Sequence, residues 1–207
     1  MERWVYRTFV VGLMLLVAIL IAPHPIATND GPVHLAFSNL MVTLHQPGHP
    51  LQQKAYYISL GPYPNLTIYI LLDSLIRVVP PDIAESVIQI LSIVGPIAAC
   101  YFALGMINPR NVWLAVFLLP LSLNQTFFLG LYNHCISIAA FFLAIATYYW
   151  MLKAPSFARA AAVSGLLILA FFSHASGFIM AFAGIATISA ILATRSYFRS
   201  RDLRACY

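Results

Sequence analysis

One acidic residue stands between the first long apolar stretch of the chain and a segment of helical periodicity. This residue, Asp30, lies in the run NDGP, and apolar residues recur with helical spacing over 33–45. Asp30 can cap the free N–H groups of the helix that follows, with Pro32 in its first turn. Its carboxylate can instead serve as a general base, which needs direct reach to the proton it accepts. Both interpretations stay open, and His34 lies on the polar side of the same helix.

A pair of opposite charges, Asp73 and Arg77, interrupts the apolar segment 64–79. The i, i+4 spacing puts both side chains on one helix face, where they can pair. A charge at the bilayer centre costs about 2.5–3.5 kcal/mol on insertion scales, so an interfacial or re-entrant helix suits this segment better than a span. The pair is either structural or part of a relay or substrate contact.

Polar residues also occupy two short breaks between apolar segments. Asn133 and His134 lie in one break, and His174 lies in the other, within the run SHASG. A histidine beside a polar turn is either held by hydrogen bonds of the fold or available as a donor and proton acceptor. These three residues are therefore candidate substrate-binding residues.

Two further spacings have structural explanations. His45 and His49 stand four apart, but a proline and a glycine between them break the helix that a metal site would require. Asp82 and Glu85 stand three apart at a helix start, as in a capping box with Asp in place of Ser or Thr. No nucleotide-binding or hydrolase motif is present, so we expect neither a metal nor a cofactor.

The composition places these residues in a membrane protein. Of the 207 residues, 61% are hydrophobic and 8% are charged, whereas a soluble domain is about 45–50% apolar and about 25% charged. Disorder needs few hydrophobic residues and high net charge, and is excluded as well. The net charge of +5 shows no basic patch with interleaved aromatics, so no nucleic-acid partner is expected. We expect an all-α, polytopic integral membrane bundle surrounded by membrane lipids.

About six apolar segments predict membrane crossings, since a spanning helix needs about 20 apolar residues. We treat residues 1–207 as a single transmembrane domain. The first segment resembles an uncleaved signal anchor, although a cleaved signal peptide has a similar layout. Segment 160–193 is too long for one span and its polar interruption favours a hairpin. The predicted crossings are 9–22, 84–107, 112–128, 135–152, 160–173 and 178–194, and the external loop 23–83 carries interfacial helices at 33–45 and 64–79.

Positive-inside counting chooses between two topologies. If 64–79 spans the membrane and 160–193 crosses once, most loop cations fall outside. If 64–79 lies at the outer interface and 160–193 is a hairpin, only Lys54 and Arg77 remain outside. The second topology is therefore predicted. It describes a multi-pass protein of the plasma (inner) membrane with both termini cytoplasmic and all the candidate residues on the outer side.

This layout resembles the N-terminal half of the GT-C superfamily of membrane glycosyltransferases, which includes protein mannosyltransferases and aminoarabinose transferases. The resemblance rests on the runs NDGPVHL and PYPNLTIYILL and on the topology, and covers residues 1–180. It implies that Asp30 matches the acidic residue of the family's first external loop, accompanied by His34. It also implies that FFLGLYNHC forms the second external loop, with Asn133 and His134 where the family often has another acid. Members continue with further spans, so we expect this chain to match only their N-terminal part.

The resemblance implies inverting transfer of a sugar from a polyprenyl-phosphate carrier on the outer face. A carboxylate, here Asp30, would activate the acceptor hydroxyl, as in inverting glycosidases with an acceptor in place of water. Arg77 or His34 would contact the phosphate. Two alternatives stay open: a transporter, which needs polar groups along a path across the bilayer, and a non-catalytic relative or assembly subunit, which packs through small residues. The sequence specifies neither the sugar, nor the acceptor, nor an oligomeric state.

Overall fold

The computed structural model describes residues 2–21, 25–44, 46–48, 50–59 and 61–205. Over these residues it is all-α, with ten α-helices and one 3-10 helix, which confirms the all-α part of the predicted fold class. His45 and His49 lie outside the described residues, as does residue 22 at the end of the first predicted crossing.

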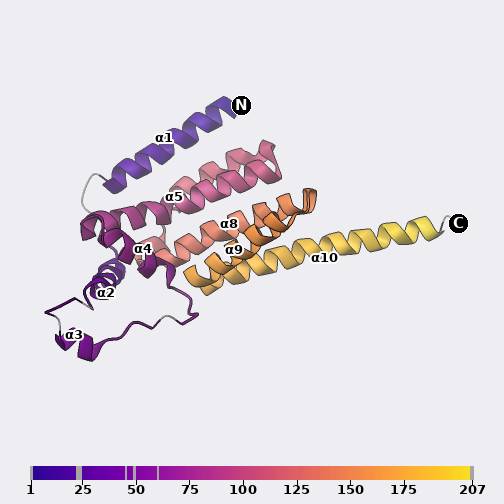
Figure 1. Ribbon diagram of the computed structural model, residues 1–207. Coiled ribbons are helices and arrows are strands. Elements are labelled where there is room, and N and C mark those ends of the chain that lie inside the picture. Colours follow the sequence, from indigo (N-terminus) through magenta and orange to yellow (C-terminus); the bar gives the residue numbers. More distant parts are fainter. Residues whose placement is uncertain (1, 22–24, 45, 49, 60, 206–207) are drawn as a thin grey trace.

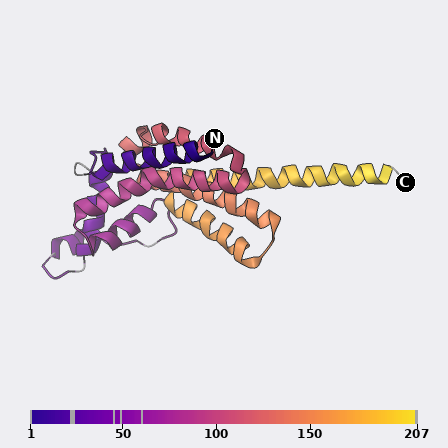
Figure 2. The ribbon, with the colours of Figure 1, turned by 90° about the horizontal axis from the view of Figure 1, so that it is seen from above.

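The long helices lie side by side and form the body of the molecule (Figure 1). They are α1 (Glu2–Ile21), α5 (Pro81–Ile107), α8 (Tyr132–Lys153), α9 (Phe157–Ser173) and α10 (Ala175–Ala205). Helix α8 is central and packs against α5, α9 and α10. Its buried Ala140 and Ala144 let neighbouring backbones approach closely. In Figure 2, α10 runs well beyond the ends of the other helices.

Three of the described helices are long and apolar enough to cross a membrane. They are α5, α8 and the part of α10 from Ala175 to Phe198. The apolar part of α1 (Tyr6–Ile19) and helix α9 are shorter. These lengths and compositions indicate a multi-pass membrane protein with three candidate spans.

Shorter helices gather at one end of the body (Figure 1). They are α2 (Gly31–Thr43), α3 (Pro50–Ala55) and α4 (Thr67–Ile76). Helix α2 packs against α4, and both contact α5. The predicted helices 33–45 and 64–79 correspond to α2 and α4. Helix α4 also contributes Ile68 and Leu72 to the core, at 0% and 1% exposure, so it is anchored to the bundle by its apolar face.

The stretch 112–128 differs from its prediction as one continuous helix. It forms a 3-10 helix η1 (Pro109–Phe117), a single turn α6 (Leu118–Leu121) and a second turn α7 (Gln125–Phe128). Pro120 removes a backbone donor inside the stretch. The side chain of Asn124 accepts a hydrogen bond from the N–H of Phe127 and starts α7 as a separate turn. Apolar composition therefore did not ensure a regular helix here.

The predicted break in 160–193 is confirmed at His174. This residue is extended (φ −163°, ψ 136°) and separates α9 from α10. The two helices pack against each other as a hairpin. Their turn lies at the end of the body that carries α2 and α4 (Figure 1).

The predicted capping box at Asp82 and Glu85 is wrong. Helix α5 begins at Pro81 with Pro80 as its N-cap, and no side chain caps it. Proline is preferred as the first helical residue, so the helix starts before Asp82 rather than after it. Glu85 is consequently one turn inside α5, where it is buried at 7% exposure.

The opposite end of the body carries cations stacked on aromatic rings. Lys153 Nζ lies 4.4 Å from the ring centre of Tyr149, and the guanidinium of Arg159 lies 4.0 Å from the ring centre of Trp150. Amphipathic aromatic and basic side chains of this kind are typical of a membrane–water interface. Both ends of the chain point the same way as this α8–α9 turn (Figure 1).

Candidate functional site

A cavity of about 180 Å³ gathers most of the predicted site residues. Its lining consists of Asp30, His34, Asn65, Tyr69, Leu131, Asn133, His134 and His174. These residues come from segments far apart in the chain: the start of α2, the loop and first turns of α4, the start of α8 and the α9–α10 break. We call this space the polar cavity.

The backbone of Asp30 is fixed against the segment that precedes α8. The Asp30 N–H donates to the carbonyl of Leu129 at 3.1 Å, and the Asn29 N–H donates to that of Phe128 at 3.0 Å. Gly130 has φ +78°, and a Cβ there would lie 2.8 Å from the nitrogen of Asp30. Only glycine permits this close approach in the left-handed conformation. The backbone of Asp30 is therefore held in close contact with the segment around Gly130.

The side chain of Asp30 does not cap α2. Asp30 holds the N-cap position but has φ −98° and ψ −7°, whereas capping residues are typically extended, and it makes no capping hydrogen bond. The carboxylate instead accepts a hydrogen bond from the Asn29 side chain at 2.8 Å. The side-chain cap, one of the two interpretations of Asp30, is therefore wrong, and Asp30 lines the polar cavity.

His34 is held by both of its ring nitrogens. Nε2 lies 3.1 Å from the carbonyl oxygen of Gly130, and Nδ1 lies 3.0 Å from the hydroxyl of Tyr69. A carbonyl oxygen only accepts, so Nε2 carries the proton and Nδ1 of the neutral ring accepts from Tyr69. Burial lowers the pKa of His34 against the opposing effects of the Gly130 carbonyl and Asp30. This geometry gives His34 a role in positioning Tyr69 and α2.

The two other histidines of the cavity share one partner. Nδ1 of His134 lies 3.0 Å from Oγ of Ser176, and Nδ1 of His174 lies 2.7 Å from the same oxygen. Their rings meet edge to face at 5.1 Å between centroids. Among the described residues, no group of three metal-ligating side chains is placed to hold a metal ion.

Asn133 fastens the start of α4 to α8. Its Oδ1 accepts from the N–H of Ile68 at 3.0 Å, and its Nδ2 donates to the carbonyl of Asn65 at 3.0 Å. With 4% exposure and both ends of the amide engaged, Asn133 shapes the wall of the polar cavity.

Asp73 and Arg77 form the predicted pair but do not line the polar cavity. Arg77 donates to both carboxylate oxygens of Asp73, at 3.0 and 3.1 Å. The hydrogen bonds and the charge of Asp73 raise the pKa of Arg77. The Arg77 side chain is 55% exposed, so the pair is a surface contact on α4.

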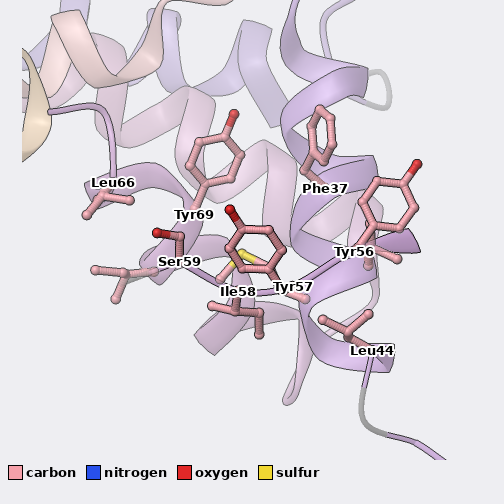
Figure 3. Close-up of a pocket in the computed structure, with 11 residues that line it drawn as sticks. Phe37, Leu44, Tyr56, Tyr57, Ile58, Ser59, Leu66 and Tyr69 are labelled. Carbon is pink, nitrogen blue, oxygen red and sulfur yellow. The ribbon is translucent and has the colours of Figure 1, made fainter. Parts of the chain in front are cut away.

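A second space, an apolar groove of about 350 Å³, is shown in Figure 3. It is lined by Phe37, Leu40, Met41, Leu44, Tyr56, Tyr57, Ile58, Ser59, Leu66, Tyr69 and Ile70. Tyr69 lines both spaces. Its hydroxyl is held by His34, while burial and then the charge of Asp30 raise its pKa. A mainly apolar groove and a polar cavity therefore share one lining residue, Tyr69.

A buried polar cluster behind the cavity was not predicted. It consists of Thr28, Glu85, Gln89 and Tyr132. One signal was present in the sequence: Glu85, Gln89 and Ser92 recur at i, i+4 and i+7, which gives an otherwise apolar helix a polar face. The local resemblance of Asp82 and Glu85 to a capping box obscured that signal.

The chain matches no protein-family model, and no curated protein or solved structure is significantly similar to it.

Proposed function

We propose that this protein is a membrane glycosyltransferase of the GT-C type, or the N-terminal part of one. It takes a sugar from a polyprenyl-phosphate carrier on the outer face, with Asp30 as the base. In this proposal about six segments cross the plasma (inner) membrane and both termini are cytoplasmic. The observation that carries the proposal is the junction of the polar cavity with the apolar groove at Tyr69.

The groove and the cavity match the two parts of a lipid-linked sugar. A CH₂ group takes up about the volume of a water molecule, about 30 Å³, so the 350 Å³ groove accommodates about a dozen carbons of a hydrocarbon chain. The polar cavity offers a carboxylate, imidazoles and a tyrosine hydroxyl, which suit a sugar and a phosphate. An amphipathic substrate fits this pair of spaces better than a wholly polar or wholly apolar one.

Helix direction favours a phosphate at the cavity. Helices α2, α8 and α10 all begin beside it, at Gly31, Tyr132 and Ala175. Helix N-termini carry partial positive charge and unpaired N–H groups, both of which favour an anion. His134 and His174 add hydrogen-bonding groups on the same side. These features support binding of the carrier's phosphate near α8 and α10.

In the proposed reaction, Asp30 acts on the acceptor. The acceptor's hydroxyl oxygen attacks the anomeric carbon as the bond from that carbon to the phosphate oxygen breaks. Asp30 takes the hydroxyl proton, and polyprenyl phosphate leaves with the bonding electrons. Attack from the face opposite the leaving group inverts the anomeric configuration. Asp73 and Arg77 take no part, because they do not line the cavity.

The test is transfer from polyprenyl-phosphate sugars to hydroxyl acceptors by the protein in lipid nanodiscs. Asp30→Asn should lower the rate by about 10²–10⁴-fold, the usual value of general-base catalysis. The folded yield should stay unchanged, because the Asp30 side chain caps no helix. Asp82→Asn, at an exposed position in the first turn of α5, is the matched control. Retention of transfer by Asp30→Asn would refute the base assignment.

One observation favours a second function, lipid binding without transfer. Most polar side chains of the cavity are already engaged with one another or with the backbone, as His34, Asn133 and His174 show. Binding of a fluorescent polyprenyl phosphate by the wild-type protein, with no transfer from any sugar-bearing form, would establish this alternative.

A further inference from the structure

The buried polar cluster connects three segments of the chain. The Tyr132 hydroxyl on α8 lies 2.7 Å from Oγ1 of Thr28 and accepts from Nε2 of Gln89 at 3.1 Å. It also donates to Glu85 over a longer distance, 3.5 Å. Gln89 and Tyr132 are 0% exposed, and Glu85 is 7% exposed. Buried networks of this kind fix one arrangement of the elements they join.

Gln89 fastens the extended segment that leads to Asp30. Its Oε1 accepts from the N–H of Ile26 at 2.9 Å, and its Nε2 donates to the carbonyl of Ile26 at 2.8 Å. One amide thus satisfies both backbone groups of one residue, as a neighbouring strand would. Thr28, two residues further, is then held by Tyr132.

Gly31 brings the cluster into contact with the first turn of α2. A Cβ on Gly31 would meet the side-chain oxygens of Thr28, Glu85 and Tyr132, all within 2.7 Å. The cluster therefore packs directly against the residue that follows Asp30. These oxygens therefore occupy the space that a side chain at position 31 would need.

Glu85 is the member of this cluster whose burial costs the most free energy, because it is the only carboxylic acid among them. Ionisable groups in apolar helices are expensive and mark functional regions. Within the described part of the chain, the only ion pair joins Arg77 to Asp73, so no cation accounts for the burial of Glu85. Its contacts with Tyr132 and with the edge of Gly31 point to hydrogen bonding and shape as its contribution.

We propose that Glu85 and Tyr132 are positioning residues that hold the start of α2, and thereby the carboxylate of Asp30, in the polar cavity. The effect on catalysis rests on the proposed transferase function. The effect on the geometry of position 30 does not.

Two readouts test the proposal separately. The first is the rate at which an impermeant thiol reagent modifies Asp30→Cys, in protein whose native cysteines are replaced by alanine. The second is the transfer kinetics of the protein that retains Asp30. Glu85→Ala and Tyr132→Phe, the latter removing only a hydroxyl, should each change the labelling rate several-fold. In the transfer assay both should lower kcat by up to about 10²-fold, with a smaller effect on KM.

Glu85→Gln is the rescue variant, since it keeps the shape and a hydrogen-bonding group, and it should match the wild type in both readouts. Asp82→Asn, on the same helix but exposed, should change neither. Unchanged labelling in both Glu85→Ala and Tyr132→Phe would overturn the proposal, and so would a Glu85→Gln variant as impaired as Glu85→Ala. If the wild type shows no transfer while labelling responds as expected, the transferase function fails and the positioning role stands.

Discussion

At the residue scale, His34 connects α2 to α4 through the hydroxyl of Tyr69. Its neutral ring has one donor and one acceptor, and the structure uses both, on the Gly130 carbonyl and the Tyr69 hydroxyl. A protonated ring would have two donors, so the hydroxyl of Tyr69 would have to turn and accept. The protonation state of His34 therefore sets whether the Tyr69 hydroxyl donates or accepts in this contact.

The lowered pKa of His34 predicts a pH effect on stability. As pH falls below about 6.5, the unfolded chain takes up a proton that the folded ring still refuses, so the free energy of unfolding decreases. The wild type should therefore lose more thermal stability between pH 7 and pH 5 than His34→Gln, which cannot titrate. Equal losses in the two proteins, followed by thermal unfolding in detergent, would contradict this.

The exposed pair of Asp73 and Arg77 should contribute little to stability. Solvent-exposed ion pairs are screened and lose side-chain entropy when they form. Asp73→Asn and Arg77→Gln should each leave the Tm nearly unchanged in thermal unfolding. A marked loss in each single variant that is recovered in the double variant would show instead that the pair is poorly solvated.

At the element scale, the start of α2 depends on Gly130 in the turn before α8. Gly130→Ala should destabilise the fold, because alanine at φ +78° is strained by about 1–2 kcal/mol and its Cβ would press on backbone atoms 2.8 Å away. Gly48 also has a positive φ but faces open space. Gly48→Ala should therefore show the strain without the clash.

A further control variant should raise the stability rather than lower it. Gly165 lies inside α9 with nothing near its missing Cβ, so Gly165→Ala should stabilise the helix by about 0.5–1 kcal/mol. Thermal unfolding of the three variants would rank them Gly165→Ala, Gly48→Ala and Gly130→Ala, from highest to lowest Tm. A Gly130→Ala variant as stable as Gly48→Ala would show that the close approach of the two segments is not needed.

Elements with a strong local signal could be predicted from the sequence. Helical periodicity and apolar length predicted α2, α5 and α8, and the polar run around His174 predicted the α9–α10 break. The stretch 112–128 could not be predicted in this way. It is as apolar as a membrane-spanning helix, but Pro120 and Asn124 divide it into short helical turns.

The sequence predicted which residues the candidate site contains, but not which of their side chains are in contact. Topology placed Asp30, Asn133, His134 and His174 on the same side, and the structure gathers them in one cavity. The contacts of His34 with Gly130 and of Tyr132 with Thr28 join positions distant in sequence, and no local pattern encodes them. Glu85 was misassigned for the same reason, since its burial depends on α8.

At the scale of the whole molecule, the direction of the helices predicts which groups face each side of the membrane. Ser59 lies in the chain between α3 and α4, and Arg110 lies in η1, directly after α5. Helices α3 and α4 lie at one end of the body, and α5 ends at the other (Figure 1). In intact cells, and in a background without native cysteines, Ser59→Cys should react with an impermeant thiol reagent. Arg110→Cys should react only after permeabilisation. Labelling of Arg110→Cys in intact cells would invert the proposed topology.

The unequal legs of the α9–α10 hairpin have a consequence for the surrounding bilayer. The 17 residues of α9 reach about 25 Å at 1.5 Å per residue, less than the hydrocarbon thickness of about 30 Å. In the proposed topology, where α9 crosses the bilayer, the lipid beside it must thin or the helix must pull its flanking residues inward, and either costs free energy that grows with each ångström of mismatch. The protein should therefore be more stable to heat in vesicles of short-chain phosphatidylcholine than in long-chain ones. Lengthening α9 by one turn should shift that optimum toward thicker bilayers, which would make acyl-chain length a means of adjusting how the polar cavity sits relative to the lipid headgroups.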